Sequence, residues 1–568
     1  MGSSRVVLST ILAATLIAGA SAQPASRGGI DSIQEPALKE WLTYIASDEL
    51  QGRATYSEGL GLAAGYIAQQ LKQWGVKPAG DNGSYFQTVK VLGVNTTSRS
   101  SVTVEVNGQS RTFKDGEGVT FPRNMGGKQT LSAATVRFAG YGLSIPEANH
   151  DDYADFEAAG AAVVYLGSAA PNGVAVETRR LMSGRARLAL ERGAIATIAP
   201  VGTGRGRRGG PPERADDQGR GAAPTGGQRG GRGGQAAAGA DFTTVQRLDH
   251  LVPPAVTGSD EFFDFLFSGS EVDYAAVKQQ AAAQAPLRPF TLDGVKLTFN
   301  IDADYQIVRT RLTRNVVGIV EGSDAKLKDT YVVYGAHYDH TGYRDAAARQ
   351  ESGQPLDVIN NGADDDGSGT VALMAIARAF ALGPRPKRSI LFVWHAGEES
   401  GLLGSRYNAD YPVVPLDRMV AQLNIDMIGR NRDDDPKQAD TVYVVGSDRI
   451  STELHNINED ANASLRQPLT MDYEMNDPAD PQSIYTRSDH YSYASKGIPI
   501  VFYFTGIHSD YHRPSDTVDK IIFEKLARIT KLAYETGRRV ANLARAPVRD
   551  NKGPRAGKAF KGKITTIP

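Results

Sequence analysis

Asn360–Gly369 reads Asn-Asn-Gly-Ala-Asp-Asp-Asp-Gly-Ser-Gly, and the rest of the chain is organised around this stretch. Three adjacent carboxylates between glycines repel one another, so we expect a cation to offset their charge, and a pair of metal ions is the natural candidate. The run also opens a predicted helix, Thr370–Leu382, whose N-terminus favours negative charge. A solvated acidic loop that caps this helix is therefore the alternative interpretation.

On both sides of this stretch, apolar runs predict the strands of a large sheet. Several of these runs are continuous, as expected of strands that are covered on both faces. Helical patterns lie between many of them, including Ser451–Ala461, and a last helix covers Ile521–Leu543. We therefore predict an α/β/α sandwich on a mostly parallel sheet, with ligands at the carboxyl ends of the strands. The predicted strands are Asn315–Glu321, Thr330–Ala336, Ser389–His395, Met419–Ile425, Thr441–Gly446 and Ile498–Phe504.

Ionisable side chains follow four of these predicted strands at their carboxyl ends. One such motif alone is more often a surface turn, but four that converge with the Asp run predict a shared site. Because the chain contains no cysteine, imidazole and carboxylate groups are the available zinc ligands. The four motifs are His337-Tyr338-Asp339-His340, Glu398-Glu399, Asp426-Met427 and the run from His508 to Asp516.

The 568 residues divide into several predicted parts. Residues 30–97 begin with two helical patterns and are predicted to form the N-terminal helical part of the main domain. Residues 98–285 contain short strand and turn patterns and a helical pattern over Thr178–Arg192, which indicates an inserted, mainly β module. Within it, residues 203–240 are rich in Gly and Arg and bury too little apolar area to order, so we predict a disordered loop. The remaining parts are the rest of the main domain, 286–546, and a tail, 547–568.

Composition and charge exclude some functions. A net charge of −1 provides no field that would gather nucleic acid or an anionic membrane surface. Residues 1–22 have the form of a cleavable export signal, with Arg5, the apolar run Val6–Ala18 and the small residues Ala20-Ser21-Ala22. No later stretch is apolar enough to span a membrane. We expect a secreted or periplasmic protein without a stable membrane anchor and without a nucleic-acid partner, and the sequence predicts no particular oligomeric state.

The order of the motifs resembles that of the di-zinc exopeptidases of the bacterial leucyl aminopeptidase type, a family that also holds glutamate carboxypeptidases and glutaminyl cyclases. Asp48–Arg53, followed by Gly80–Gln87, resembles members that carry a protease-associated (PA) domain insert. The resemblance covers most of the chain after the export signal, apart from the Gly/Arg-rich loop and the tail. The shared motifs are His-x-Asp, Gly-Ala-Asp-Asp-Asp-x-Ser-Gly, Glu-Glu-x-Gly-Leu-x-Gly-Ser, Asp-Met and His-x-Pro-x-Asp-Thr.

The resemblance implies a site that holds two zinc ions. By motif, His337 and Asp426 would bind one ion, Glu399 and His512 would bind the other, and Asp365 would bridge both. One histidine and one carboxylate for each ion, with a shared carboxylate, leave positions open for water and substrate.

The resemblance also assigns roles to residues that do not bind metal. Glu398 would act as the general base, Asp339 would orient His337, and Tyr485 would stabilise the oxyanion. Asp364 is expected to be a capping or turn residue, and Asp366 to orient the bridge or cap the helix. We expect lining or structural roles for His340, His490 and His508.

The implied function is that of a secreted zinc aminopeptidase that acts on peptides with a free N-terminus. A carboxypeptidase or a glutaminyl cyclase on the same scaffold is the first alternative, and a non-catalytic peptide-binding relative is the second. All the implied ligands and Glu398 are present, which favours an enzyme, and the three-carboxylate run favours an aminopeptidase. Arginines that could bind a substrate carboxylate keep the carboxypeptidase alternative open, namely Arg344, Arg406, Arg430 and Arg487.

Overall fold

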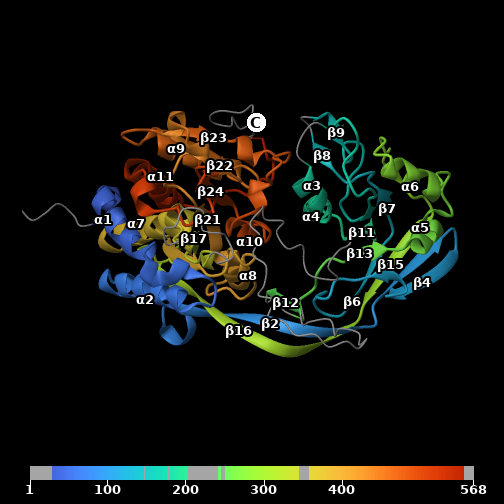
Figure 1. Ribbon diagram of the computed structural model, residues 1–568, viewed down its shortest axis with the longest axis horizontal. Helices are drawn as coiled ribbons and strands as arrows, with labels where there is room; N and C mark the ends of the chain where they lie inside the picture. Colours follow the sequence, from blue (N-terminus) through green and yellow to red (C-terminus); the bar gives the residue numbers. More distant parts are fainter. Residues whose placement is uncertain are drawn as a thin grey trace, which may run out of the picture.

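The computed structural model describes residues 28–145, 148–174, 178–201, 241–244, 248, 250–343 and 357–555 of the chain. These residues build two large sheets, each with its own helices (Figure 1). The predicted export signal, the Gly/Arg-rich loop 203–240 and the end of the predicted tail lie outside the described residues. No described helix combines the length and the apolarity that crossing a membrane requires.

The first sheet carries the strands that the apolar runs predicted. In order across the sheet it consists of β12 (Asp241–Thr244), β2 (Phe86–Ser98), β16 (Ala303–Val320), β20 (Ser389–His395), β17 (Tyr331–His337), β21 (Met419–Ile425), β24 (Ile500–Phe504), β22 (Thr441–Val445) and β23 (Thr470–Asp472), and β1 (Lys77–Pro78) pairs with β16. The central strands β20, β17, β21 and β24 pair in parallel. β16 and β22 flank this block in antiparallel orientation. The prediction of a mostly parallel core is confirmed.

Helices cover both faces of this first sheet. Successive residues of β17 point to opposite faces, so that Tyr334 packs in the core under the larger helical layer and Val333 packs in the core on the other face. The larger layer consists of α1 (Glu35–Ile45), α2 (Glu58–Gln73), α7 (Gly369–Leu382), α9 (Thr452–Ala463) and α11 (Phe523–Asn542). The opposite face carries α8 (Leu403–Asp410) and α10 (His490–Ala494).

A second, curled sheet forms the other half of the molecule (Figure 1). Its strands, in order, are β14 (Phe290–Thr291), β7 (Val136–Phe138), β10 (Ala162–Val164), β11 (Ala196–Pro200), β13 (Ala255–Gly258), β5 (Gly118–Thr120), β4 (Gln109–Asp115), β3 (Ser101–Val106), β15 (Val295–Ile301) and β6 (Gln129–Ala133). Its helices are α3 (Arg179–Ser183), α4 (Arg185–Glu191), α5 (Asp260–Phe267) and α6 (Tyr274–Ala282). Two short hairpins complete the described strands, β8 (Ser144–Ile145) with β9 (His150–Asp151) and β18 (Gly342–Tyr343) with β19 (Ile359–Asn360).

The structure differs from the sequence predictions in three places. The second sheet continues past residue 285, because β14 and β15 belong to it. The helix predicted over Thr178–Arg192 is two short helices that meet at Gly184, a poor helix former. β16 begins at Ala303, well before the predicted Asn315, because its exposed first half pairs with β2 instead of lying under helices.

Candidate metal centre

The carboxyl ends of the parallel strands bring the predicted site residues together. His337 is the last residue of β17, and Asp426 follows β21 directly. Glu398 and Glu399 lie in the loop after β20, and His512 lies in the loop after β24. Since parallel strands end at one edge of a sheet, side chains that are distant in sequence meet there.

The three adjacent aspartates lie in a buried turn, Ala363–Ser368, that leads into α7, and the three carboxylates have different partners. Asp364 accepts a hydrogen bond from Gly429 N at 2.6 Å and lies 3.4 Å from His508 Nε2. Asp366 accepts from Gly369 N at 2.9 Å and from Met427 N at 3.1 Å, so Asp366 and not Asp364 caps α7. Asp365 alone of the three lines the pocket of the site.

The first cluster of possible metal ligands consists of His337, Asp365 and Asp426. His337 Nε2 lies 3.3 Å from Asp365 Oδ1 and 3.6 Å from Asp426 Oδ1. Ser488 Oγ donates a hydrogen bond of 2.6 Å to the other oxygen of Asp426, which fixes the orientation of that carboxylate. All three cluster residues are buried.

The second cluster consists of His340, Asp365, Glu399 and His512, so Asp365 belongs to both clusters. His512 Nε2 lies 3.0 Å from Asp365 Oδ2 and 3.2 Å from Glu399 Oε1. His340 Nδ1 lies 3.0 Å from Glu399 Oε1. The sequence predicts a lining or structural role for His340, whereas its place in this cluster makes it a further candidate ligand or an orienting partner of Glu399.

The spacing of these atoms fits zinc. Two ligands at about 2.0–2.1 Å from a tetrahedral ion lie about 3.3 Å from each other, which matches the contacts of His337 and His512 with the shared Asp365. His512 Nε2 forms no hydrogen bond, although two carboxylate oxygens lie within 3.2 Å of it. Such convergence without hydrogen-bond geometry is expected of side chains that share an ion.

The electrostatics of the ligands follow from burial and from the histidines. Burial alone would raise the pKa of Asp365, but the neighbouring His337 and His512 hold it well below its usual range. Burial raises the pKa of Asp426. Burial alone would lower the pKa of His512, but the carboxylates of Glu399 and Asp365 outweigh it and raise this pKa to about 11. The shared residue Asp365 is therefore held as a carboxylate anion, the form that binds a cation.

Asp339 positions two neighbours, although not in the predicted way. His337 Nδ1 donates to the backbone carbonyl of Asp339 at 3.0 Å, so Nε2 is the ring nitrogen that faces the carboxylates. The Asp339 carboxylate lies 3.7 Å from His337 Nδ1, too far for a hydrogen bond. This carboxylate accepts instead from Glu398 N at 3.0 Å and from Thr55 Oγ1 at 3.1 Å. Asp339 thus orients His337 through its backbone and anchors the loop of Glu398 through its side chain.

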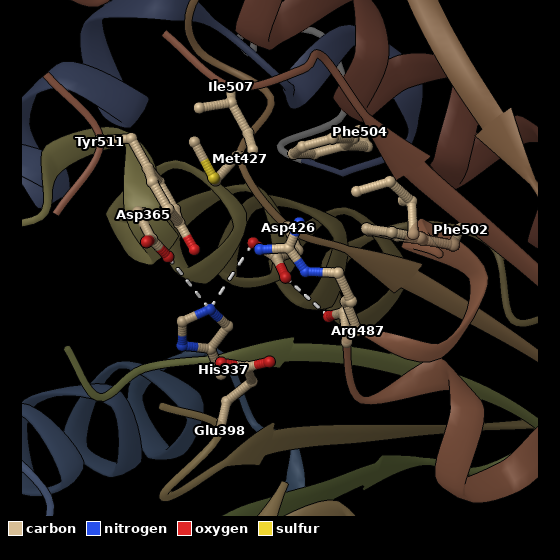
Figure 2. A pocket seen from close by; sticks show the side chains of 12 residues that line it. His337, Asp365, Glu398, Asp426, Met427, Arg487, Phe502, Phe504, Ile507 and Tyr511 are labelled. Atoms are coloured by element: carbon tan, nitrogen blue, oxygen red, sulfur yellow. Dashed lines mark hydrogen bonds and ion pairs between the residues drawn. The ribbon is translucent and has the colours of Figure 1, made fainter. Parts of the chain in front are cut away.

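Glu398 lines the same cavity as the first cluster. The described lining of this cavity includes His337, Asp365, Glu398 and Asp426. Figure 2 shows the Glu398 carboxylate beside His337, on the side opposite to Asp365. Glu398 is absent from both clusters of possible ligands, as expected of a base that is not itself a ligand.

Tyr485 does not lie where the sequence predicted. Its ring stacks under the Arg449 guanidinium at 3.7 Å and lines a different cavity, between the two halves of the molecule. Tyr511 lines the cavity of the metal centre instead, and Figure 2 shows its hydroxyl directed toward Asp365 and His337. The sequence carried a signal for Tyr511, since it directly precedes the predicted ligand His512.

The other histidines have structural partners. His490 stacks on Phe502 at 4.4 Å, its Nε2 lies 2.6 Å from the Tyr485 carbonyl oxygen, and burial lowers its pKa to about 3. His508 pairs with Asp364 beneath the centre.

A third group of possible ligands consists of Asp434, His508 and Asp510. Arg430 pairs with both of these aspartates, and Lys520 lies 2.9 Å from Asp510. The protein's own cations therefore neutralise this group.

Fold and site together define a class of protein: a helix-covered, mostly parallel sheet whose strand ends assemble two clusters of metal ligands around one shared carboxylate. The model of peptidase family M28 matches residues 315–537, which include every member of both clusters.

Curated relatives of this chain include leucine aminopeptidases of a fungus. The chain is 28% identical over 235 residues to a "Probable leucine aminopeptidase" of Arthroderma otae, a match that covers 39% of this chain and 57% of the relative. It is 25% identical over 285 residues to "Leucine aminopeptidase 2" of the same fungus, covering 46% and 51%. The chain thus spans about half the length of the curated relatives it matches.

Solved structures with a similar arrangement include an aminopeptidase from Aneurinibacillus sp. strain AM-1, at 17% identity and a TM-score of 0.43, covering 94% of this chain and all of that one. Another is the LapA aminopeptidase of Legionella pneumophila, at 27% identity and a TM-score of 0.31, covering 41% and 57%.

Proposed function

We propose that this protein is a zinc-dependent aminopeptidase that removes N-terminal residues from peptides. The observation that carries the proposal is the shared position of Asp365, which belongs to two ligand clusters in a cavity that Glu398 also lines. The leucine aminopeptidases among the relatives support the choice of reaction.

Two zinc ions would supply Lewis-acid activation of the scissile carbonyl and of a water molecule. His337 and Asp426 would hold one ion, Glu399 and His512 would hold the other, and Asp365 would contribute one carboxylate oxygen to each. This division follows the two oxygens of Asp365, because Oδ1 faces His337 and Oδ2 faces His512.

The chain's own residues would move the protons. Glu398 would accept a proton from the attacking water and pass it to the leaving amine, the usual work of a buried carboxylate at such a site. The hydroxyl of Tyr511 would donate a hydrogen bond to the carbonyl oxygen as that oxygen gains negative charge.

The location of the protein also belongs to the proposal. The export signal predicted over residues 1–22 supports secretion or a periplasmic site, and the sequence resemblance supports a PA-type identity for the curled second sheet. Peptides with a free N-terminus would be the substrates.

A panel of chromogenic aminoacyl amides tests the reaction. Free aminoacyl amides should be cleaved and N-acetylated ones should not, and dialysis against a chelator should abolish turnover until zinc is added back. Metal analysis of the same samples should give about two zinc ions per chain. Full activity in a preparation that contains no metal contradicts the proposal, and cleavage of the acetylated amides alone rejects an aminopeptidase.

A further inference from the structure

One arginine shares the cavity with the metal ligands. Of the arginines that kept the carboxypeptidase alternative open, Arg344 lies outside the described residues, Arg406 is exposed, and Arg430 pairs with acidic neighbours. Arg487 lines the cavity of the metal centre together with Asp426. Figure 2 labels Arg487 among the side chains that line this cavity.

The segment that carries Arg487 is tied to the centre. Arg487 N donates to the Ile484 carbonyl at 3.0 Å, and the guanidinium lies 3.3 Å from Gln482 Oε1. The next residue, Ser488, donates the 2.6 Å hydrogen bond that orients Asp426. A shift of the backbone at Arg487 would therefore also disturb the hydrogen bond that orients a candidate metal ligand.

The charge of the cavity favours an anionic substrate group. The two clusters contain three carboxylates, so two divalent ions would leave one positive charge, which Glu398 balances. Arg487 adds a further positive charge to the wall. The remaining described lining is apolar or neutral and includes Met427, Ile484, Phe502, Phe504 and Ile507.

We propose that Arg487 binds a carboxylate of the substrate that lies within one residue of the scissile bond. A guanidinium group pairs with a carboxylate through two parallel hydrogen bonds and repels an ammonium group. Two parts of a substrate can place a carboxylate within one residue of the scissile bond, since neighbouring Cα atoms are about 3.8 Å apart. One source is the C-terminus of a dipeptide, and the other is an acidic side chain on the N-terminal residue.

This inference rests on the proposed function, and its test separates the two. The zinc-loaded Glu398→Gln protein provides a background in which substrate persists, so binding is measured by calorimetry without turnover. The probes are two matched pairs: Leu-Leu with Leu-Leu-amide, and the 4-nitroanilides of Glu and Gln. We expect the carboxylate member of one pair to bind about 10- to 100-fold more tightly than its neutral partner. The pair that shows this preference identifies the source.

Variants at Arg487 complete the test. Arg487→Gln in the same background should abolish the preference, and Arg487→Lys should keep part of it. Arg418→Gln, at an exposed arginine on the short turn Leu416–Arg418, is the matched control and should keep the whole preference. Zinc content, measured on every variant, excludes loss of the centre as the cause.

The outcomes are distinct. Equal binding within both pairs, with zinc in place, overturns the assignment of Arg487, as does a preference that survives Arg487→Gln. If none of the four probes binds and the wild-type protein cleaves none of them, the proposed function fails as well.

Discussion

Glu398 and Glu399 are neighbours in the chain, yet the fold gives their carboxylates different surroundings. Glu399 lies between two histidines, with Oε1 3.0 Å from His340 Nδ1 and 3.2 Å from His512 Nε2. Glu398 lines the cavity beside the first cluster and belongs to neither set of possible ligands. Two identical side chains at adjacent positions are thus suited to different tasks, one to holding metal and one to moving protons.

Glu398→Gln should separate catalysis from metal binding. The amide has the same shape and leaves the ligands in place, so zinc content should stay near normal while kcat falls by about 100- to 10,000-fold. Asp365→Asn should lose both metal and activity, because it removes the charge that both clusters share. Zinc analysis and steady-state kinetics on the two variants check the contrast. Wild-type turnover in Glu398→Gln would show that the base is another group.

Tyr511→Phe and Tyr485→Phe form a matched pair at the residue scale. Tyr511 lines the cavity of the metal centre and Tyr485 lines the other cavity. Loss of a hydrogen-bond donor to the developing oxyanion costs about 100- to 1,000-fold in kcat, so this loss is expected for Tyr511→Phe. Tyr485→Phe should keep kcat within about threefold of the wild type, since the stacking of its ring on Arg449 is retained. The reverse order of effects in stopped assays would restore the sequence-based assignment of Tyr485.

Zinc binding should release protons. In the metal-free chain, Glu399 and Asp365 raise the pKa of His512 to about 11, so its imidazole carries a proton at neutral pH. A zinc ligand must be unprotonated, so the ion displaces this proton, and zinc affinity rises with pH up to that pKa and weakens as the pH falls. Calorimetric titrations with zinc in buffers of different ionisation enthalpy measure the released protons. Enthalpies that do not depend on the buffer would contradict the protonated state of His512.

At the scale of elements, the buried side chain of Arg53 joins three segments around the centre. Its guanidinium group donates to the Tyr338 carbonyl at 2.9 Å, to the Asn361 carbonyl at 2.7 Å and to the Gly362 carbonyl at 2.9 Å, and it also bonds the Ile45 carbonyl. These carbonyls belong to the end of α1, the chain after β17 and the approach to the aspartate turn. Burial lowers the pKa of Arg53 to about 10, which still leaves it charged at neutral pH.

Arg53→Met should therefore destabilise the protein strongly. The substitution leaves several buried carbonyls without a donor, at about 1–3 kcal/mol each, so we expect a loss of at least about 3 kcal/mol in the free energy of unfolding. Lys77→Met breaks an exposed ion pair with Glu321 and should cost less than about 1 kcal/mol. Denaturant unfolding of both variants measures the difference. Similar small losses in both would show that the contacts of Arg53 are replaceable.

At the scale of the whole molecule, the metal centre lies where separate parts of the fold meet. Four parallel strands and the turn before α7 contribute to it, and Arg53 connects it to the N-terminal helices. The long pair β2 and β16 links this first sheet to the curled second sheet (Figure 1). Binding of an ion at the centre would therefore be coupled to the packing of the first sheet and its helices.

Zinc should raise the thermal stability of the folded chain. A ligand that binds only the folded state stabilises it by about 2.7 kcal/mol at 100 times its Kd. The Tm of the metal-free protein should accordingly rise with zinc concentration, and Asp365→Asn should flatten this dependence. Scanning calorimetry over a zinc series measures both. A constant Tm in the wild type, with bound zinc verified by metal analysis, would contradict the coupling.

Much of the first sheet was predictable because its strands are continuous apolar runs bounded by polar loops. β20 and β21 begin and end at the predicted residues. The candidate ligands were predictable for a related reason. His337 and Asp426 stand at the ends of such runs, and parallel strands deliver their carboxyl ends to one edge whatever the details of packing.

Side-chain direction in irregular segments was not predictable. Ile484 and Arg487 line the metal cavity, whereas Tyr485, between them in the chain, lines the other one, and nothing in the spacing of these residues distinguishes the two sides. The same holds for Arg53, whose role depends on carbonyl groups that lie far away in sequence. The alternation of buried and exposed positions in a strand or helix can be read from the order of residues. The contact of a single side chain with distant backbone cannot, because it depends on how the finished elements pack. In this protein that packing places Tyr511 and Arg487 in the cavity of the metal centre.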